Sequence, residues 1–542
     1  DVAAGTSFGK LDINLSYSKN NKDGYRKKVF SDSDFFLGKL RYHINESDSL
    51  EFQYSYFDNA YKDAKMLTKE QINKNRRQSG LSSKDNSKNS IQKGEWNFTY
   101  NAKWTDWLEH QSNLFYQSTE IKSHEYEDAL PFYQYRIDMY QQMLAMPNIN
   151  PMMAESLKKQ IQATKEIISK NPKMELHQGS RFKDQKFGFK TKNKFTYGEK
   201  SDFILGLGYI HNKMSRDSWA YSKNTKTNQR IETLTNTKIP LNKKTFEIFG
   251  LNTYRHNNWE LIQGLRFEKS KYNGKRQYKD LQYPLKDRTM NNVAATLAVN
   301  YLYSDTGNIY TKYERGFTSP APAQLMDKIK KNGKYDYVNN NLTSEKSNSF
   351  EIGWNDYFFH SLISADAFYS ETKDEISTVF SAGHGTTFSN INIGQTKRYG
   401  FDVKASQIFE KWTFSEAYSY TNAKIVKDKN KAYEGKYISY VPRHKFSLNA
   451  TYAITPKWTL GGEYQYSSSV YLDNANKNGK DGARSVVNLQ TSYDFNSYFS
   501  VYAGIKNVLD HKYYDSVRED SGKKYYSPAP ERNYYAGFRY QF

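Results

Sequence analysis

The sequence predicts an all-β chain that crosses a membrane as an antiparallel β-barrel, and three observations support this prediction. Apolar and polar residues alternate with a period of two along most of the chain. The segments with this pattern are joined alternately by very short and by long polar links. Aromatic residues make up 16% of the 542 residues, although only 37% are hydrophobic. Together these features are typical of a barrel with one face toward lipid and the other toward water.

The composition excludes several other classes of protein. Mean hydropathy is −0.90, but 47 Tyr and 32 Phe are too many for a disordered chain, which is poor in aromatic residues. No window of eighteen consecutive apolar residues is present, which excludes transmembrane helices. The chain has no cysteine, so disulfides and thiolate metal sites are excluded as well.

The net charge is +21, because the chain has 79 basic and 58 acidic side chains. Such a charge suits nucleic acid, an anionic membrane surface or an acidic ligand. An AT-rich genome would also produce it, since Lys, Asn, Tyr, Ile and Phe are enriched together. No compact basic helix or run of Lys and Arg is present, so we expect no nucleic-acid partner.

The strands are clearest in residues 11–17, 293–303, 446–454 and 534–542, where apolar and polar side chains alternate. A period of two gives each strand one apolar and one polar face. We expect the apolar set near residue 450 to face lipid and the polar set to face the lumen: Phe446, Leu448, Tyr452 and Ile454 against Lys445, Asn449 and Thr451.

The links between strands fall into two groups. Short links are expected at 45–48, 198–200, 304–307, 455–457 and 496–497. Long polar links are expected at 18–31, 64–88, 126–180, 220–240, 274–289, 319–342, 381–389, 428–441, 473–482 and 517–530. Short turns at one end and long loops at the other are the signature of an outer-membrane barrel. A soluble β-sandwich or β-solenoid is the alternative, but a sandwich needs turns every 8–12 residues, and many strands here are longer.

One long link contains two predicted helices, at 131–146 and 151–170, each with Pro in its first turn. The helical insertion spans 129–176. Six of the ten Met residues lie between 139 and 174, either as packing between the helices or as an adaptable docking surface. The insertion is interpreted as a lid over a ligand site or as a finger that docks on a carrier protein. The lid is slightly favoured, because the polar face has no strong single-sign patch.

No catalytic or metal-binding motif is present. The ten His residues are scattered and lack a metal-ligand spacing such as H-E-x-x-H. We therefore predict no enzyme activity, no resident cofactor and no metal site.

Four segments give the chain a resemblance to a known family. They are residues 313–320 (YERGFTSP), 340–347 with 350–353 (NNLTSEKS, FEIG), 397–402 (KRYGFD) and 504–513 (GIKNVLDHKY). They resemble, in order, the FRAP-type box, the NPNL-K-P-E box, the R-x-x-G-x-E strand and the penultimate N-L-F-D-K-x-Y strand of TonB-dependent outer-membrane receptors. Phe542 resembles the aromatic C-terminus of these barrels.

The resemblance implies a 22-stranded barrel of which about 21 strands lie in residues 1–542, whereas the family's first strand and N-terminal plug domain are absent from these residues. It also implies that the protein lies in the bacterial outer membrane, among its lipids and lipopolysaccharide. The plug would contact the energy-coupling protein TonB. Residues 319–342 would form the seventh external loop.

The ligand site is expected in that loop, where lysines and tyrosines would attract an anionic iron chelate: Lys328, Lys330, Lys331, Lys334, Tyr335 and Tyr337. His384 is a further candidate contact, for haem or a metal chelate. Haem receptors of this family usually carry a His in the seventh loop, but residues 319–342 contain none. Thr318 and Ser319 also stand where the family typically has Arg and Ala.

The function implied by the resemblance is active import of an iron chelate, most simply a ferric siderophore. One alternative is a receptor for haem or for a host iron-carrier protein. The other is a passive porin-like channel, because a barrel of this size without a plug would be an open pore.

Overall fold

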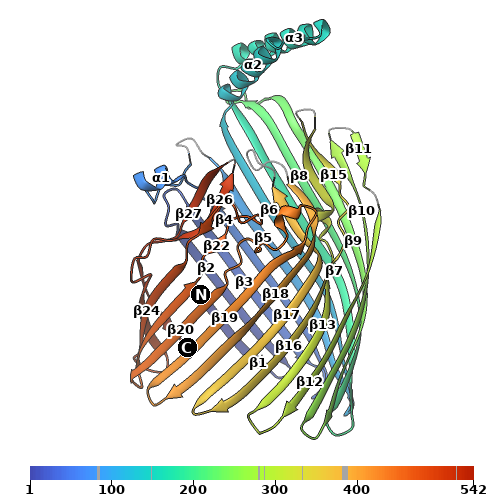
Figure 1. Ribbon diagram of the computed structural model, residues 1–542, viewed down its shortest axis with the longest axis vertical. Helices are drawn as coiled ribbons and strands as arrows, with labels where there is room; N and C mark the ends of the chain where they lie inside the picture. The colour runs from blue at the N-terminus through green and yellow to red at the C-terminus, as the bar shows by residue number, and fades with distance from the viewer. Residues whose placement is uncertain are drawn as a thin grey trace.

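Strands that follow one another in the chain also lie side by side in space, and together they form the wall of a barrel (Figure 1). The computed structural model describes residues 1–541 except 82–85, 148, 279–280, 286, 332–333, 381–387 and 521. The side chains of 283, 328–331, 334–337, 379–380, 388 and 520 are also outside the description.

The wall is built from strands of 7 to 27 residues. They are β1 (Val2–Phe8), β2 (Leu11–Asp23), β3 (Phe30–His43), β4 (Ser49–Lys62), β5 (Lys88–Thr105), β6 (Leu108–Asp128), β7 (Met174–Tyr197), β8 (Ser201–Asn224), β9 (Arg230–His256), β10 (Trp259–Tyr278), β12 (Arg288–Leu302), β13 (Asn308–Thr318), β16 (Glu345–Phe358), β17 (Ser361–Phe380), β18 (Phe388–Phe409), β19 (Trp412–Lys427), β20 (His444–Thr455), β21 (Trp458–Ser467), β24 (Arg484–Asp494), β25 (Phe499–Lys506) and β28 (Asn533–Tyr540).

Short elements occupy the loops. They are β11 (Leu281–Pro284), β14 (Met326–Lys331), β15 (Lys334–Asn339), β22 (Val470–Tyr471), β23 (Lys480–Asp481), β26 (Tyr514–Asp520), β27 (Lys523–Pro528), the 3-10 turns η1 (Pro322–Leu325) and η2 (Lys431–Tyr433), and the helices α1 (Lys69–Lys74), α2 (Leu130–Leu144) and α3 (Pro151–Lys170). The main sheet has 24 strands among the described residues. Three of them, β11, β14 and β15, belong to loop hairpins, which leaves 21 strands in the wall. This confirms the predicted all-β barrel; a further strand upstream of Asp1 stays a prediction.

Exposure alternates along each wall strand, as β10 illustrates. Leu265 and Phe267 are 63% and 36% exposed on the outer face, whereas Glu268 and Ser270 are 6% and 0% exposed on the inner face. In β20, Leu448 lies opposite Tyr464 of β21, and Asn449 lies opposite Glu463. The apolar residues therefore share the lipid face and the polar residues share the lumen, because cross-strand partners lie on the same side of a sheet.

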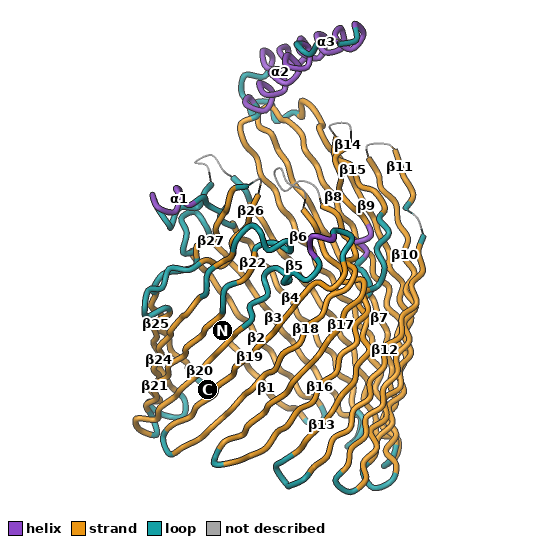
Figure 2. The backbone as a smooth tube through the Cα atoms, viewed as in Figure 1, coloured by secondary structure: helices purple, strands orange, loops and turns teal. Residues whose placement is uncertain are grey.

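The wall is tall from β6 to β10, five consecutive strands that have 20 to 27 residues each. A tilted strand needs only about 9–11 residues to cross a bilayer, so these strands continue beyond the membrane at the loop end (Figure 2). The loop expected at 220–240 is consequently wrong. β8 continues to Asn224 and β9 begins at Arg230, because β-branched residues at 231–239 keep pairing with the preceding strand.

The helices α2 and α3 form a finger that projects from the top of this tall side, away from the barrel (Figure 1). Asn150 caps α3 by accepting a hydrogen bond from the Met152 amide, 2.9 Å away. No helix among the described residues is both long and apolar enough to span a bilayer. The small helix α1 was not predicted, although Thr68 and Gln71 form a capping box that is visible in the sequence.

Candidate ligand-binding site

Residues 319–344, here called loop 7, connect β13 to β16 and fold against the inner face of the tall wall. The first anchor is a hydrogen bond of 2.9 Å from the Tyr272 hydroxyl to the Pro320 carbonyl. The second is the buried Met326, which packs on Met214 and Ile239. Both contacts are made by lumen-facing positions, so loop 7 begins inside the rim of the barrel.

The far end of loop 7 is held by polar contacts. Arg288 donates to the carbonyl oxygens of Leu342, at 2.8 Å, and Asn340, at 2.5 Å. Asp327 accepts hydrogen bonds from the Asn340 side chain and from the Asn390 amide, both at 2.8 Å. Hydrogen bonds to charged groups are stronger than neutral ones, so these residues fix the loop firmly to β12 and β18.

A charged network lies below the start of loop 7 on the lumen wall. Glu247 is 3% exposed and pairs with Lys190 at 3.1 Å and with Arg266 at 2.6 Å. Arg266 also contacts Glu268 at 3.2 Å, and Glu268 accepts a very short hydrogen bond from Ser319. Each buried carboxylate thus has a cationic partner, which a buried charge requires. The network links loop 7 to β7, β9 and β10.

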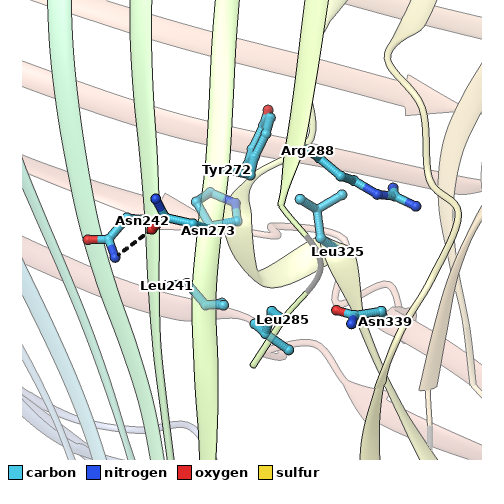
Figure 3. A pocket seen from close by; sticks show the side chains of 9 residues that line it. Leu241, Asn242, Tyr272, Asn273, Leu285, Arg288, Leu325 and Asn339 are labelled. Atoms are coloured by element: carbon cyan, nitrogen blue, oxygen red, sulfur yellow. Dashed lines mark hydrogen bonds between the residues drawn. The ribbon is translucent and has the colours of Figure 1, made fainter. Parts of the chain in front are cut away.

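A narrow cavity of about 20 Å³ separates the base of loop 7 from the wall (Figure 3). Its lining includes Leu241, Leu285 and Leu325, with Arg288 at one side. This apolar space serves the packing of the loop on the wall.

A larger recess of about 530 Å³ opens on another part of the lumen wall, between β19 and β24. Its volume is that of a pocket for a small molecule. Lumen-facing side chains and one external loop line it, among them Ser419, Lys445, Gln465, Arg484, Tyr513 and Asp515. Sequence reasoning placed Lys445 in the lumen but missed the recess, because its members come from segments far apart in the chain.

The two loop residues of the recess, Tyr513 and Asp515, lie outside the membrane-spanning segments. Shielding from water raises the pKa of both groups, and the charge of Arg484 opposes this shift. The Tyr513 hydroxyl is protonated at neutral pH, so it can donate a hydrogen bond to an anionic ligand.

The predicted site residues lie on the hairpin β14–β15 of loop 7. Its backbone register places Lys328 opposite Tyr337, Lys330 opposite Tyr335, and Lys331 opposite Lys334. The side chains of all six lie outside the described residues, and so does the whole of His384.

A histidine cluster that sequence reasoning did not single out lies on the outer face of the tall wall. His177 is stacked between Tyr126 and Tyr221, with ring centroids 5.1 and 5.0 Å away, and its Nδ1 is 3.2 Å from Nε2 of His124. The described residues contain no group of three or more His, Cys, Asp or Glu arranged to hold a metal ion. The cluster faces away from the lumen and supports the strands beneath the finger.

A family model described as TonB dependent receptor-like, beta-barrel matches residues 34–508. The chain belongs to this family. As a member, the receptor lies in the bacterial outer membrane, and its long loops face the outside of the cell.

Two curated relatives are similar to parts of this receptor. A "Probable TonB-dependent receptor BfrD" from Bordetella pertussis is 26% identical over 285 residues, which cover 49% of this chain and 37% of that protein. A "Probable TonB-dependent siderophore receptor PiuA" from Acinetobacter baumannii is 25% identical over 273 residues, which cover 47% of this chain and 35% of that protein. The matched parts thus span little more than a third of these relatives.

Solved structures show the same fold over residues 1–542. The ferric citrate transporter FecA superposes with a TM-score of 0.74 at 16% identity, covering 99% of this chain and 74% of that one. The ferric-catecholate import receptor Fiu from Escherichia coli K12 gives 0.74 at 13% identity, covering 100% and 79%.

Proposed function

We propose that this receptor imports an anionic ferric chelate, a siderophore complex, across the outer membrane with energy supplied through TonB. The observation that carries the proposal is loop 7, which is held inside the rim and is linked by Ser319 to the charged network of the lumen wall. A loop fixed in this way can contact a ligand in the lumen and respond to its binding. The names of the Acinetobacter relative and of the ferric citrate and ferric-catecholate structures agree with this ligand class.

The recess between β19 and β24 supplies suitable chemistry for such a ligand. Lys445 and Arg484 are cationic, and Tyr513 adds a hydroxyl donor. Catecholate and carboxylate chelates of iron are anionic, so two cations and a hydroxyl on a polar wall would attract and orient them.

The loop-7 hairpin would form the upper part of the same site. We propose Lys328, Lys330, Lys331, Lys334, Tyr335 and Tyr337 as ligand contacts, with His384 as a further contact. Strand β14 pairs through Lys328 with β18, the strand that follows residues 381–387. The start of β18 therefore lies beside the loop-7 hairpin.

The two alternative functions, a receptor for haem or a carrier protein and a passive channel, have less support. None of the relatives reported above is named for haem or for a carrier protein. A passive channel is not favoured either, because the family is one of TonB-dependent receptors. The proposed role is transport and requires no catalytic step.

An equilibrium titration of the receptor with a ferric tris-catecholate complex tests the proposal. Changing the four loop-7 lysines to Gln, or Lys445 and Arg484 to Gln, should weaken binding about tenfold and reduce its salt dependence, because exposed charges act over about 10 Å and are screened. Replacement of Lys200 and Lys411, in the short turns, by Gln is the charge control. Unchanged affinity and salt dependence in both sets of variants would show that the chelate does not bind at loop 7 or in the recess.

A further inference from the structure

The charged residues of the recess between β19 and β24 follow a regular order across its floor. Lys445 of β20 lies opposite Ser419 of β19 and opposite Ser467 of β21. Ser467 in turn lies opposite Arg484 of β24, and Asp402 of β18 lies opposite Ser419. Cross-strand partners share one face of a sheet, so these five residues form one row across the lumen wall, here called the floor row. Strands β20 and β24 both begin at this level, so the floor row lies at the loop end of the wall.

The spacing of the floor row keeps its charged groups apart. Directly opposite residues have their Cβ atoms about 5 Å apart, so Asp402, Lys445 and Arg484 follow one another at about 10 Å, with a serine between each and the next. Ser419 donates a hydrogen bond to one carboxylate oxygen of Asp402. Within the part of the chain that the structure describes, no ion pair joins any of the three charged groups to a partner.

A second carboxylate reaches the recess from the loop that connects β25 to β28. This carboxylate belongs to Asp515, which lines the recess together with Tyr513. The Tyr513 carbonyl accepts a hydrogen bond from Arg76. Two residues beyond Asp515, the Val517 carbonyl accepts a hydrogen bond of 3.1 Å from the Tyr440 hydroxyl. The backbone is therefore held on both sides of Asp515, whose carboxylate forms no ion pair with any described residue either.

Charged groups elsewhere on the lumen wall are paired with one another. Arg398, which lies on the same face of β18 as Asp402, pairs with Glu375 at 2.8 Å. The network below loop 7 likewise gives Glu247 two cationic partners. A partly shielded charge is stabilised by an opposite charge close to it. Because the recess carries both signs of charge and leaves them unpaired, a ligand that itself carries both signs would satisfy all of them.

We propose that the recess selects ferric chelates that carry a free ammonium group beside their anionic iron-binding groups. This inference rests on the proposed function and narrows its ligand class to chelates with both signs of charge. Lys445 and Arg484 hold the anionic groups, whereas Asp402 and Asp515 accept hydrogen bonds from the ammonium group. The two carboxylates also repel chelates that are anionic throughout, and repulsion of the wrong ligand is a source of specificity.

The test compares two forms of one synthetic ferric tris-catecholate that carries a single primary amine on its backbone. In the second form the amine is acetylated, so the two forms differ by one positive charge. Equilibrium titration of the whole receptor in detergent micelles should show binding of the amine form at least about tenfold tighter, because a hydrogen bond between charged groups contributes that much. This preference should shrink at high salt, because salt screens the charges.

Changing Asp402 and Asp515 together to Asn should abolish the preference, so that the two forms bind within about twofold of each other. The acetylated form should bind this variant at least as tightly as it binds wild type, because the repulsion is removed. The matched control removes the same charge in the short turns at the other end of the barrel, through Asp106→Asn with Asp305→Asn, and should keep the preference. Equal loss in the control would show an effect of bulk charge and overturn the inference.

A further variant separates this inference from the proposed function. Lys445→Gln with Arg484→Gln should weaken binding of both forms and leave their ratio unchanged. Equal binding of the two forms by wild type would overturn this inference alone, as would an undiminished preference after loss of both carboxylates. If neither form binds wild type, or if the Lys445 and Arg484 variant binds both as wild type does, the recess is not the chelate site and both proposals fail there.

Correct folding of the variant without the two carboxylates is checked by its heat-modifiable migration on a gel, because Asp402 belongs to the wall. If that variant does not fold, the single variant Asp515→Asn changes only the loop and should still lower the preference several-fold. An Asp515→Asn receptor that keeps the full preference would overturn the inference.

Discussion

Loop 7 and the finger are both insertions between neighbouring wall strands, but they are attached in different ways. Loop 7 is held at both ends, by Tyr272 at the start and by Arg288 at the end, and it lies against the lumen. The finger is attached only at its base. There Tyr133 is completely buried and contacts Ser222 and Glu232 at 2.6 and 3.1 Å.

Loop 7 is therefore part of the lumen, whereas the finger is a separate module attached at the top of the wall. A ligand in the lumen would contact residues of loop 7, and any movement there would be transmitted to Arg266 and Glu268 through Ser319. The finger points away from the barrel mouth (Figure 1). This orientation favours docking on a carrier protein over a lid, and the role of the finger stays a prediction that its deletion tests.

The largest effect is expected at the base of the finger. Tyr133→Ala removes a buried ring from the cluster with Ala129, Met174 and Leu176, and should cost about 3–5 kcal/mol of local stability, as for other buried aromatics. Hydrogen exchange of α2 and α3 measures this loss, while the barrel should remain folded. Tyr135→Ala, at a 69% exposed position on the same helix, is the control. Equal exchange in the two variants would contradict the attachment described here.

Both insertions depend on a wall whose two faces differ, and neighbouring positions in β20 test this. Leu448→Arg puts a charge on the lipid face and should cost about 2–4 kcal/mol if the position is near the midplane. Asn449→Arg puts the same charge in the lumen and should cost much less. Folding titrations into lipid vesicles compare the two. If both variants are equally stable, the facing of this strand is wrong.

A smaller effect is expected where loop 7 is fastened at its end. Arg288→Gln removes charged hydrogen bonds to the carbonyls of Leu342 and Asn340, each worth about 1.5–3 kcal/mol. The loop should loosen, and affinity for a ferric tris-catecholate should fall about tenfold or more while the melting temperature of the barrel hardly changes. Arg315→Gln, at an exposed position of β13, is the control. A lower melting temperature without loss of affinity would mean that Arg288 stabilises the barrel wall and does not position loop 7 for the ligand.

The fold could be predicted from sequence much further than the site could. Alternation in segments such as 446–454 depends only on local pattern, and the strand count and lumen-facing polar residues followed from it. The extent of β8 and β9 could not be predicted, because polar strands above the membrane have no lipid face to mark them. The recess around Lys445 and Arg484, and the contact of Ser319 with Glu268, depend on how neighbouring strands pair, which brings together residues 39 and 51 positions apart in the chain.

The smallest effect on the barrel is expected from removal of the finger itself. Asp128 and Glu175 are opposite each other at the tops of β6 and β7, so a short Gly/Ser link can replace residues 129–174 without changing the register of the wall. Folding and affinity for a ferric tris-catecholate should stay within about twofold of wild type, because the finger points away from the lumen. Growth on iron bound to a carrier protein is the separate measurement, and its selective loss would assign docking to the finger. If both chelate binding and growth on carrier-bound iron are lost, the finger must cover the mouth of the barrel. The distinction drawn here between the finger and loop 7 would then be wrong.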